Sequence, residues 1–144
     1  MRSEVHKRPS IISKELSITD TGENGCHQAG ILVPKDITIL PFFPSLDGSV
    51  KNPRCVITFT DHFGEKWTFN FIYYNGAKFD RGKNEYRLTG MTKFFRAYNV
   101  RAGDKLIFKR DTDGFYFIEH DIKKDDASPS GRLKLSNSWK VVKI

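Results

Sequence analysis

The sequence predicts a single, mainly β domain of the α+β class: a barrel or sandwich of about seven short strands with two short helices. Short runs in which apolar and polar residues alternate predict the strands, and turns rich in Gly and Asp separate these runs. One later stretch carries apolar residues at helical spacing instead. The 144 residues include twelve Phe, five Tyr and two Trp, which is enough bulk for one core.

The first third of the chain is expected to hold two strands and one helix after a charged tail at residues 1–10. The run SIISKELSIT (10–19) alternates and is rich in β-branched residues, which predicts a strand. HQAGILVP (27–34) predicts a second strand that ends at a proline. Residues 35–40 are expected to form a short helix that stops before Pro41.

The strongest strand signal lies in the middle of the chain. RCVITFTD (54–61) and KWTFNFIYYN (66–75) both alternate and are joined by the turn HFGE, so they predict a hairpin. Trp67, Phe69 and Phe71 fall on one face of it, which we expect to be buried.

The second half of the chain predicts one helix among further strands. Helical spacing appears in GMTKFFRAYNV (90–100). Strands are expected at EYRLT (85–89), KLIFKRD (105–111) and FYFIEHDI (115–122). Residues 123–144 are expected to form a solvated linker and a final strand, so the folded domain is expected to span residues 11–122.

The net charge predicts a polyanionic partner, and the N-terminus and the cysteines predict a cytoplasmic location. The formal net charge of +7 suits a polyanion, because Lys and Arg displace the counterions condensed on phosphates. The charged N-terminus lacks the apolar segment of a signal peptide, and no run of eighteen apolar residues is present. We therefore expect a cytoplasmic protein with no membrane partner, in which Cys26 and Cys55 are reduced.

No catalytic motif stands out in the sequence. Asp113 and the Asp121–Lys123 stretch loosely match the carboxylates and lysine of Mg²⁺-dependent nucleases, but 28% of the residues are charged and such a pattern arises by chance. His120 is expected to point outward from its strand, and His62 to lie in a solvated turn. We expect no catalytic residue, no metal site and no cofactor in this domain.

Two Gly-bearing segments concentrate polar side chains instead. The first spans residues 22–30, with His27 and Gln28 in it and Lys14 upstream. The second is KFDRGKNEYR (78–87), in which Asn84 and Glu85 stand within a basic run. Arg pairs with guanine, Asn or Gln with adenine, and Glu accepts from cytosine, so this mixture suits base edges better than phosphates alone. The alternative is a solvated loop in which Glu85 pairs with Arg81 or Lys83.

These residues carry a family resemblance. SKELSITDTGENGCHQAGILVPK (13–35) resembles the start of the effector-binding N-terminal domain of EcoRII-type restriction endonucleases, with its Lys, Leu-Ser, Thr-Gly and His-Gln-x-Gly before an apolar run ending in Pro. NEYRLTG (84–90) resembles the Asn-Glu-x-Arg recognition arm of the same family. YRLTGMTKFFRAYNVRAGDKLIFKR (86–110) is similar to the plant B-three transcription-factor domain. The resemblance covers about residues 11–122.

The resemblance implies a seven-stranded open β-pseudobarrel with two short helices. It also implies two arms that grip the major groove of duplex DNA, each reading half of a site near 5′-CCWGG, where W is A or T. The first arm (about residues 14–33) would contact DNA through Lys14, His27 and Gln28. The second arm (about residues 78–89) would do so through Lys78, Arg81, Lys83, Asn84, Glu85, Tyr86 and Arg87, with Tyr86 standing where the family has a basic residue.

The expected function is therefore a sequence-specific DNA-binding module of a prokaryotic type II restriction endonuclease, monomeric as an isolated domain. Mg²⁺ would belong to the nuclease of the parent protein. One alternative is a stand-alone transcription factor of the plant type. Another is a small metal-dependent nuclease built on Asp113 and Asp121. The last is a single-strand or RNA binder that stacks bases on Trp67, Phe69 and Phe71.

Overall fold

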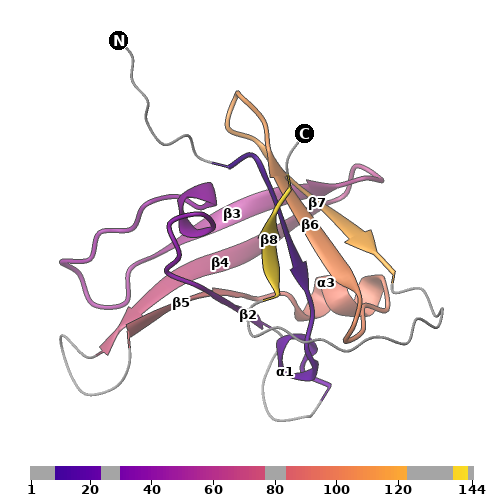
Figure 1. Ribbon diagram of the computed structural model, residues 1–144, viewed down its shortest axis with the longest axis horizontal. Helices are drawn as coiled ribbons and strands as arrows, with labels where there is room; N and C mark the ends of the chain where they lie inside the picture. The colour runs from indigo at the N-terminus through magenta and orange to yellow at the C-terminus, as the bar shows by residue number, and fades with distance from the viewer. Residues whose placement is uncertain (1–8, 24–29, 77–83, 123–137, 143–144) are drawn as a thin grey trace.

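A computed structural model describes residues 9–23, 30–76, 84–122 and 138–142. Within these ranges eight strands form one curled, open half-barrel sheet in the order β2-β5-β4-β3-β7-β6-β1-β8 (Figure 1). The strands are β1 Ile11–Glu15, β2 Gly30–Val33, β3 Arg54–Asp61, β4 Lys66–Asn75, β5 Asn84–Thr89, β6 Lys105–Arg110, β7 Tyr116–Asp121 and β8 Trp139–Val141. The mainly β fold is confirmed, with eight strands where seven were expected.

The helices with bounds in the described residues are short and lie outside the sheet. They are α1 Ile18–Thr21, the 3-10 helix η1 Leu40–Phe42 and α3 Thr92–Ala97. Helices α1 and α3 lie toward the bottom of Figure 1, and α3 confirms the helix predicted from periodicity. No helix in the described part of the chain is long and apolar enough to cross a membrane.

Two hairpins form the middle of the sheet. Strands β3 and β4 have the predicted bounds and pair antiparallel from Arg54↔Ile72 to Thr60↔Lys66. Strands β6 and β7 form the second hairpin, and β7 joins β3 in the one parallel pairing among the described strands. Strand β8 adds to β1 at one edge of the sheet, while β2 is the other edge.

Aromatic rings fill the interior of the curl. Phe43 stacks on Phe71 with ring centroids 4.7 Å apart, and Phe108 stacks on Trp139 at 5.9 Å. Each fully buried side chain of this size stabilises the fold by about 1.5–3 kcal/mol. The fully buried rings are Phe42, Phe59, Phe69, Phe71, Phe94 and Phe108.

The burial of the β4 rings contradicts the base-stacking alternative. Phe69 and Phe71 are 1% and 0% exposed, so neither can present a face to a nucleobase. Trp67 is half-buried and donates its indole N–H to Asp61. The prediction that these three side chains share a core-facing side is confirmed.

The strand predicted over residues 10–19 is wrong in its second half. Strand β1 ends at Glu15, and Ser17 begins α1 instead. The Ser17 side chain accepts a hydrogen bond from the Asp20 backbone N–H, and the Asp20 carboxylate accepts one from the Ser17 N–H. This reciprocal capping box satisfies backbone donors at the helix start, which outweighs the β-branched residues Ile18 and Thr19.

The helix predicted over residues 35–40 is also wrong. The chain forms a turn there, in which the Asp36 carboxylate accepts from the Thr38 N–H at 2.8 Å. A three-residue 3-10 helix follows at Leu40–Phe42 and contains Pro41. Proline is tolerated in the first turn of a helix, so it opens this helix rather than ending one.

His120 is the third correction. It follows Ile118 by two positions on β7 and therefore shares its inward face. Its side chain is 9% exposed, and Nε2 lies 2.9 Å from Oδ2 of Asp104. The alternation of β7 places Phe117 and Glu119, and not His120, on the opposite side.

The proposed nuclease carboxylates do not meet. Asp121 pairs with Lys105 at one end of the β6–β7 hairpin, whereas Asp113 lies in the turn that joins the two strands at the other end. Among the described residues no group of three His, Cys, Asp or Glu side chains could hold a metal ion. The geometry therefore gives the metal-dependent nuclease alternative no support.

Asp61 fastens the β3–β4 turn to α3. Burial alone would raise the pKa of its carboxyl group, but hydrogen bonds outweigh burial and hold that pKa at about 2. The donors are the Tyr98 hydroxyl, the Trp67 indole and the backbone N–H groups of Glu65 and Phe63.

Replacing Asp61 with Asn is expected to lower the free energy of unfolding by about 1–3 kcal/mol at neutral pH, because both carboxylate oxygens accept hydrogen bonds and the amide replaces one of them with an NH2 group that cannot accept. The pKa of Asp61 in the folded state, about 2, lies below the ordinary value of 3.8. The extra unfolding free energy of the wild type is therefore fully present above pH 3.8 and is lost as the pH falls toward 2. Urea unfolding of both proteins from pH 7 to pH 2 measures it. A difference that stays constant over this range would contradict the assignment.

Candidate nucleic-acid interface

The base of the second arm is anchored by a buried asparagine. Asn75, 1% exposed, pairs with Asn84 as the last step of the β4–β5 ladder. Its side-chain amide donates to the carbonyls of Val50 and Gly48 at 2.8 and 3.3 Å, and its Oδ1 accepts from the Asn52 N–H at 2.8 Å. Lys78, Arg81 and Lys83 lie outside the described residues.

Strand β5 presents a polar outer face next to this base. Arg87 Nε lies 2.9 Å from Glu85 Oε2, and the two side chains are 35% and 32% exposed. Leu32, opposite Arg87 on β2, is also exposed, while the next β5 residue, Leu88, is fully buried. This pairing along the strand orients the Arg87 guanidinium. The predicted pairing of Glu85 with Arg81 or Lys83 stays a prediction, because both partners lie outside the described residues.

Tyr86 points to the other side of β5. Its ring stacks on Tyr73 with centroids 4.2 Å apart and on Phe71 at 5.6 Å. Burial raises the pKa of the Tyr86 hydroxyl, and Tyr73 raises it further. Its contact with DNA stays a prediction that this placement does not favour, because strand alternation separates it from Glu85 and Arg87.

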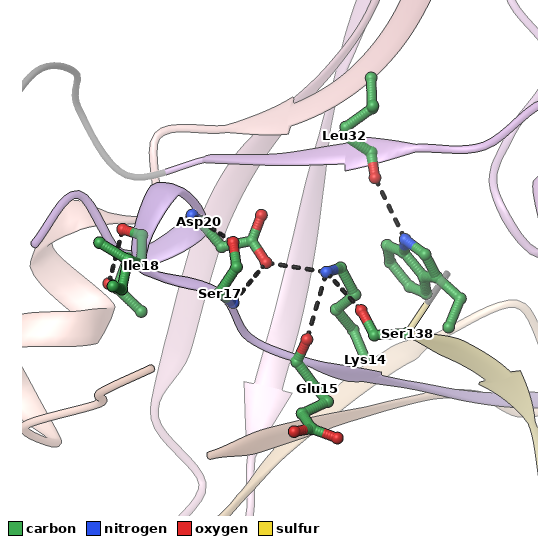
Figure 2. A network of polar contacts seen from close by, with 9 residues as sticks. Lys14, Glu15, Ser17, Ile18, Asp20, Leu32 and Ser138 are labelled. Atoms are coloured by element: carbon green, nitrogen blue, oxygen red, sulfur yellow. Dashed lines mark hydrogen bonds and ion pairs between the residues drawn. The ribbon is translucent and has the colours of Figure 1, made fainter. Parts of the chain in front are cut away.

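The described part of the first arm is built around Lys14. Its Nζ lies 2.8 Å from Asp20 Oδ2, 2.7 Å from Ser138 Oγ and 3.2 Å from the Glu15 carbonyl (Figure 2). Three acceptors match the three donors of an ammonium group. The Lys14 and Asp20 side chains are each 10% exposed. In this conformation Lys14 supports the arm from within, and its predicted contact with DNA stays untested.

His27 and Gln28 lie outside the described residues, so their contacts also stay predictions. Sequence reasoning missed Ser138 and Trp139, which the fold brings from the far end of the chain to the first arm. Trp139 is the only aromatic residue in the tail after residue 122, and that isolated large side chain was the signal available.

The segments 24–29 and 77–83 join opposite ends of one strand pair. Strand β2 pairs antiparallel with β5, and Gly30 lies opposite Thr89. The segment 24–29 precedes Gly30 at one end, while the segment 77–83 precedes Asn84 at the other. The six residues of β5 separate these ends by roughly 17 Å at about 3.4 Å a step.

Comparison with curated proteins finds relatives of two kinds. The type II restriction enzyme EcoRII of Escherichia coli is 33% identical over 107 residues, which cover 70% of this chain and 26% of the enzyme. Auxin response factor 10 of Oryza sativa subsp. indica is 32% identical over 109 residues, covering 74% of this chain and 14% of the factor. The chain thus spans about a quarter or less of these relatives.

Solved structures show the same fold. The Arabidopsis FUS3–DNA complex superposes with a TM-score of 0.61 at 22% identity, covering 78% of this chain and 96% of that chain. The complex of the Arabidopsis thaliana transcription factor LEC2 with DNA gives 0.57 at 19% identity, covering 79% and 96%.

These findings define the class as a DNA-binding domain of the EcoRII N-terminal and plant B3 type. The chain belongs to the family described as restriction endonuclease EcoRII, N-terminal, whose model matches residues 6–114. The resemblance inferred from the sequence motifs is confirmed.

Adjacent residues of β5 are expected to respond differently to truncation. Tyr86→Ala should lower the free energy of unfolding by about 2–3 kcal/mol, less than for a fully buried ring because Tyr86 is half-buried. Glu85→Ala should cost about 0–1 kcal/mol, because it removes only a partly exposed ion pair. Urea unfolding of both variants measures this, and equal costs would show that the two side chains do not face opposite sides.

Proposed function

We propose that this domain recognises a short duplex-DNA site for a type II restriction endonuclease, reading a sequence that resembles 5′-CCWGG with two arms in the major groove. The observation that carries the proposal is that Gly30 and Asn84, where the two arm segments join the sheet, lie at opposite ends of the β2–β5 pair. Their separation of roughly 17 Å matches five base pairs at about 3.4 Å each. Each arm would then meet one half of such a site.

The arms divide base reading from phosphate binding. Arg81 and Arg87 suit guanine, where a guanidinium donates two parallel hydrogen bonds. Glu85 both orients Arg87 and can accept from cytosine N4. Lys78 and Lys83 add salt-dependent attraction to phosphates, and the net charge of +7 favours the whole encounter.

Catalysis lies elsewhere in this proposal. The domain positions the enzyme on DNA, and the nuclease with its Mg²⁺ belongs to another domain of the parent protein. We propose a monomeric isolated domain in the cytoplasm of a prokaryote.

A stand-alone transcription factor is the second candidate. The similarity to auxin response factor 10 and the fold shared with FUS3 and LEC2 favour it about as much as the similarity to EcoRII favours the first. Nuclease motifs elsewhere in the reading frame of the full protein would decide for the restriction enzyme.

His27→Ala and Arg81→Ala are each expected to weaken binding to a CCWGG duplex by about 1–3 kcal/mol, because each removes a base contact. Fluorescence anisotropy at one stated salt concentration measures the change.

The matched control is Lys66→Ala. It removes one positive charge at the end of β4 away from the second arm and should change affinity far less. If neither arm variant costs more than the control, the two-arm proposal is wrong.

A further inference from the structure

The last described strand joins the two edges of the sheet. Strand β8 pairs with β1, so it forms one edge, and β2 forms the opposite edge. The Trp139 indole N–H nevertheless donates to the Leu32 carbonyl of β2 at 3.1 Å. A side chain therefore bridges the seam of the half-barrel where the sheet order provides no ladder.

The same short segment holds the upstream flank of the first arm. Ser138 Oγ lies 2.7 Å from Lys14 Nζ, and the Ser138 carbonyl accepts from the Glu15 N–H at 3.2 Å. Lys14 in turn is paired with Asp20, the residue that completes the capping box of α1 (Figure 2). Ser138 is thus connected, through one buried ion pair, to the helix that precedes residues 24–29.

Trp139 holds the downstream flank. Its ring is 8% exposed and packs on Phe108 and Phe43, so the position of the indole N–H is set by the core. The carbonyl that it binds belongs to Leu32, the β2 residue opposite Arg87. The flanks of the first arm, before residue 24 and after residue 29, are therefore tied to two adjacent residues.

We propose that Ser138 and Trp139, here called the C-terminal clasp, are positioning residues that set the geometry of the first arm and thereby its base discrimination. The inference rests on the proposed function. Base reading by paired hydrogen bonds requires side chains held within about 0.5 Å and 10–20° of the productive geometry. The clasp supplies this support by fixing both flanks to the core.

The test uses Ser138→Ala and Trp139→Phe. The first removes the hydroxyl on Lys14, and the second removes the indole donor but keeps an aromatic ring in the core. Affinities are measured for the preferred duplex and for duplexes with each base pair changed. His27→Ala and Arg81→Ala assign each base pair to the first or the second arm.

We expect discrimination at first-arm base pairs to fall about two- to tenfold in each clasp variant, the worth of one hydrogen bond. Discrimination at second-arm base pairs should stay unchanged. Val142→Ala, in the same terminal segment, and Ile118→Val, a core change outside the clasp, are the controls and should leave both profiles unchanged. If a thermal melt shows that Trp139→Phe does not fold, Ser138→Ala alone provides the comparison between first-arm and second-arm base pairs.

Two outcomes overturn the inference in distinguishable ways. In the first, the wild-type protein discriminates between base pairs, and the clasp variants either match it or lose discrimination equally at the base pairs of both arms. This result contradicts the clasp inference and leaves the proposed function standing. In the second, the wild-type protein binds every duplex with equal affinity. This result contradicts both the proposed function and the clasp inference.

Discussion

Closure of the half-barrel by side chains is the constraint on which the rest of this structure depends. The sheet order leaves β2 and β8 as separate edges, so packing across the interior must hold the curl. The rings of Phe71 on β4, Phe43 after η1, Trp139 on β8 and Phe108 on β6 form a continuous set of contacts across that interior. Trp139 also donates a hydrogen bond to the Leu32 carbonyl of β2. The same residue therefore packs in the core and connects the two edges of the sheet.

This closure determines where the polar arms can lie. Strands β2 and β5 are neighbours, and their antiparallel pairing places Gly30 and Asn84, where the segments 24–29 and 77–83 join the sheet, at opposite ends of the pair. The stem of the second arm is fixed by the buried Asn75, and the first arm by the buried Lys14–Asp20 pair. A buried ion pair adds little net stability, but removing one partner is costly, which favours a single arrangement of the charges. In the proposed function, these fixed attachment points would let the two segments read base edges by position.

Sequence reasoning was most accurate where structure depends on near neighbours. Alternation placed β3 and β4 at their observed bounds, and helical spacing found α3. It failed where capping or distant residues determine the structure. The capping box of Ser17 and Asp20 starts α1 where a strand was predicted, and His120 faces inward because it contacts Asp104. Residue type selected Glu85 and Arg87 of β5 as candidates, and their contact with DNA stays a prediction. Alternation separates Tyr86 from both, but its stacking on Tyr73 and Phe71 shows which side faces the core. The contact of Ser138 with Lys14 spans most of the chain, and no local pattern predicts it.

Selection of binding sites from a pool of random duplexes, at one stated salt concentration, tests the central claim most directly. If two fixed arms hydrogen-bond to bases in the major groove, the pool converges on one short site, bound about 10³-fold or more tightly than unrelated duplexes. A pool that shows no enrichment, with affinity that depends on salt but not on sequence, would contradict the account.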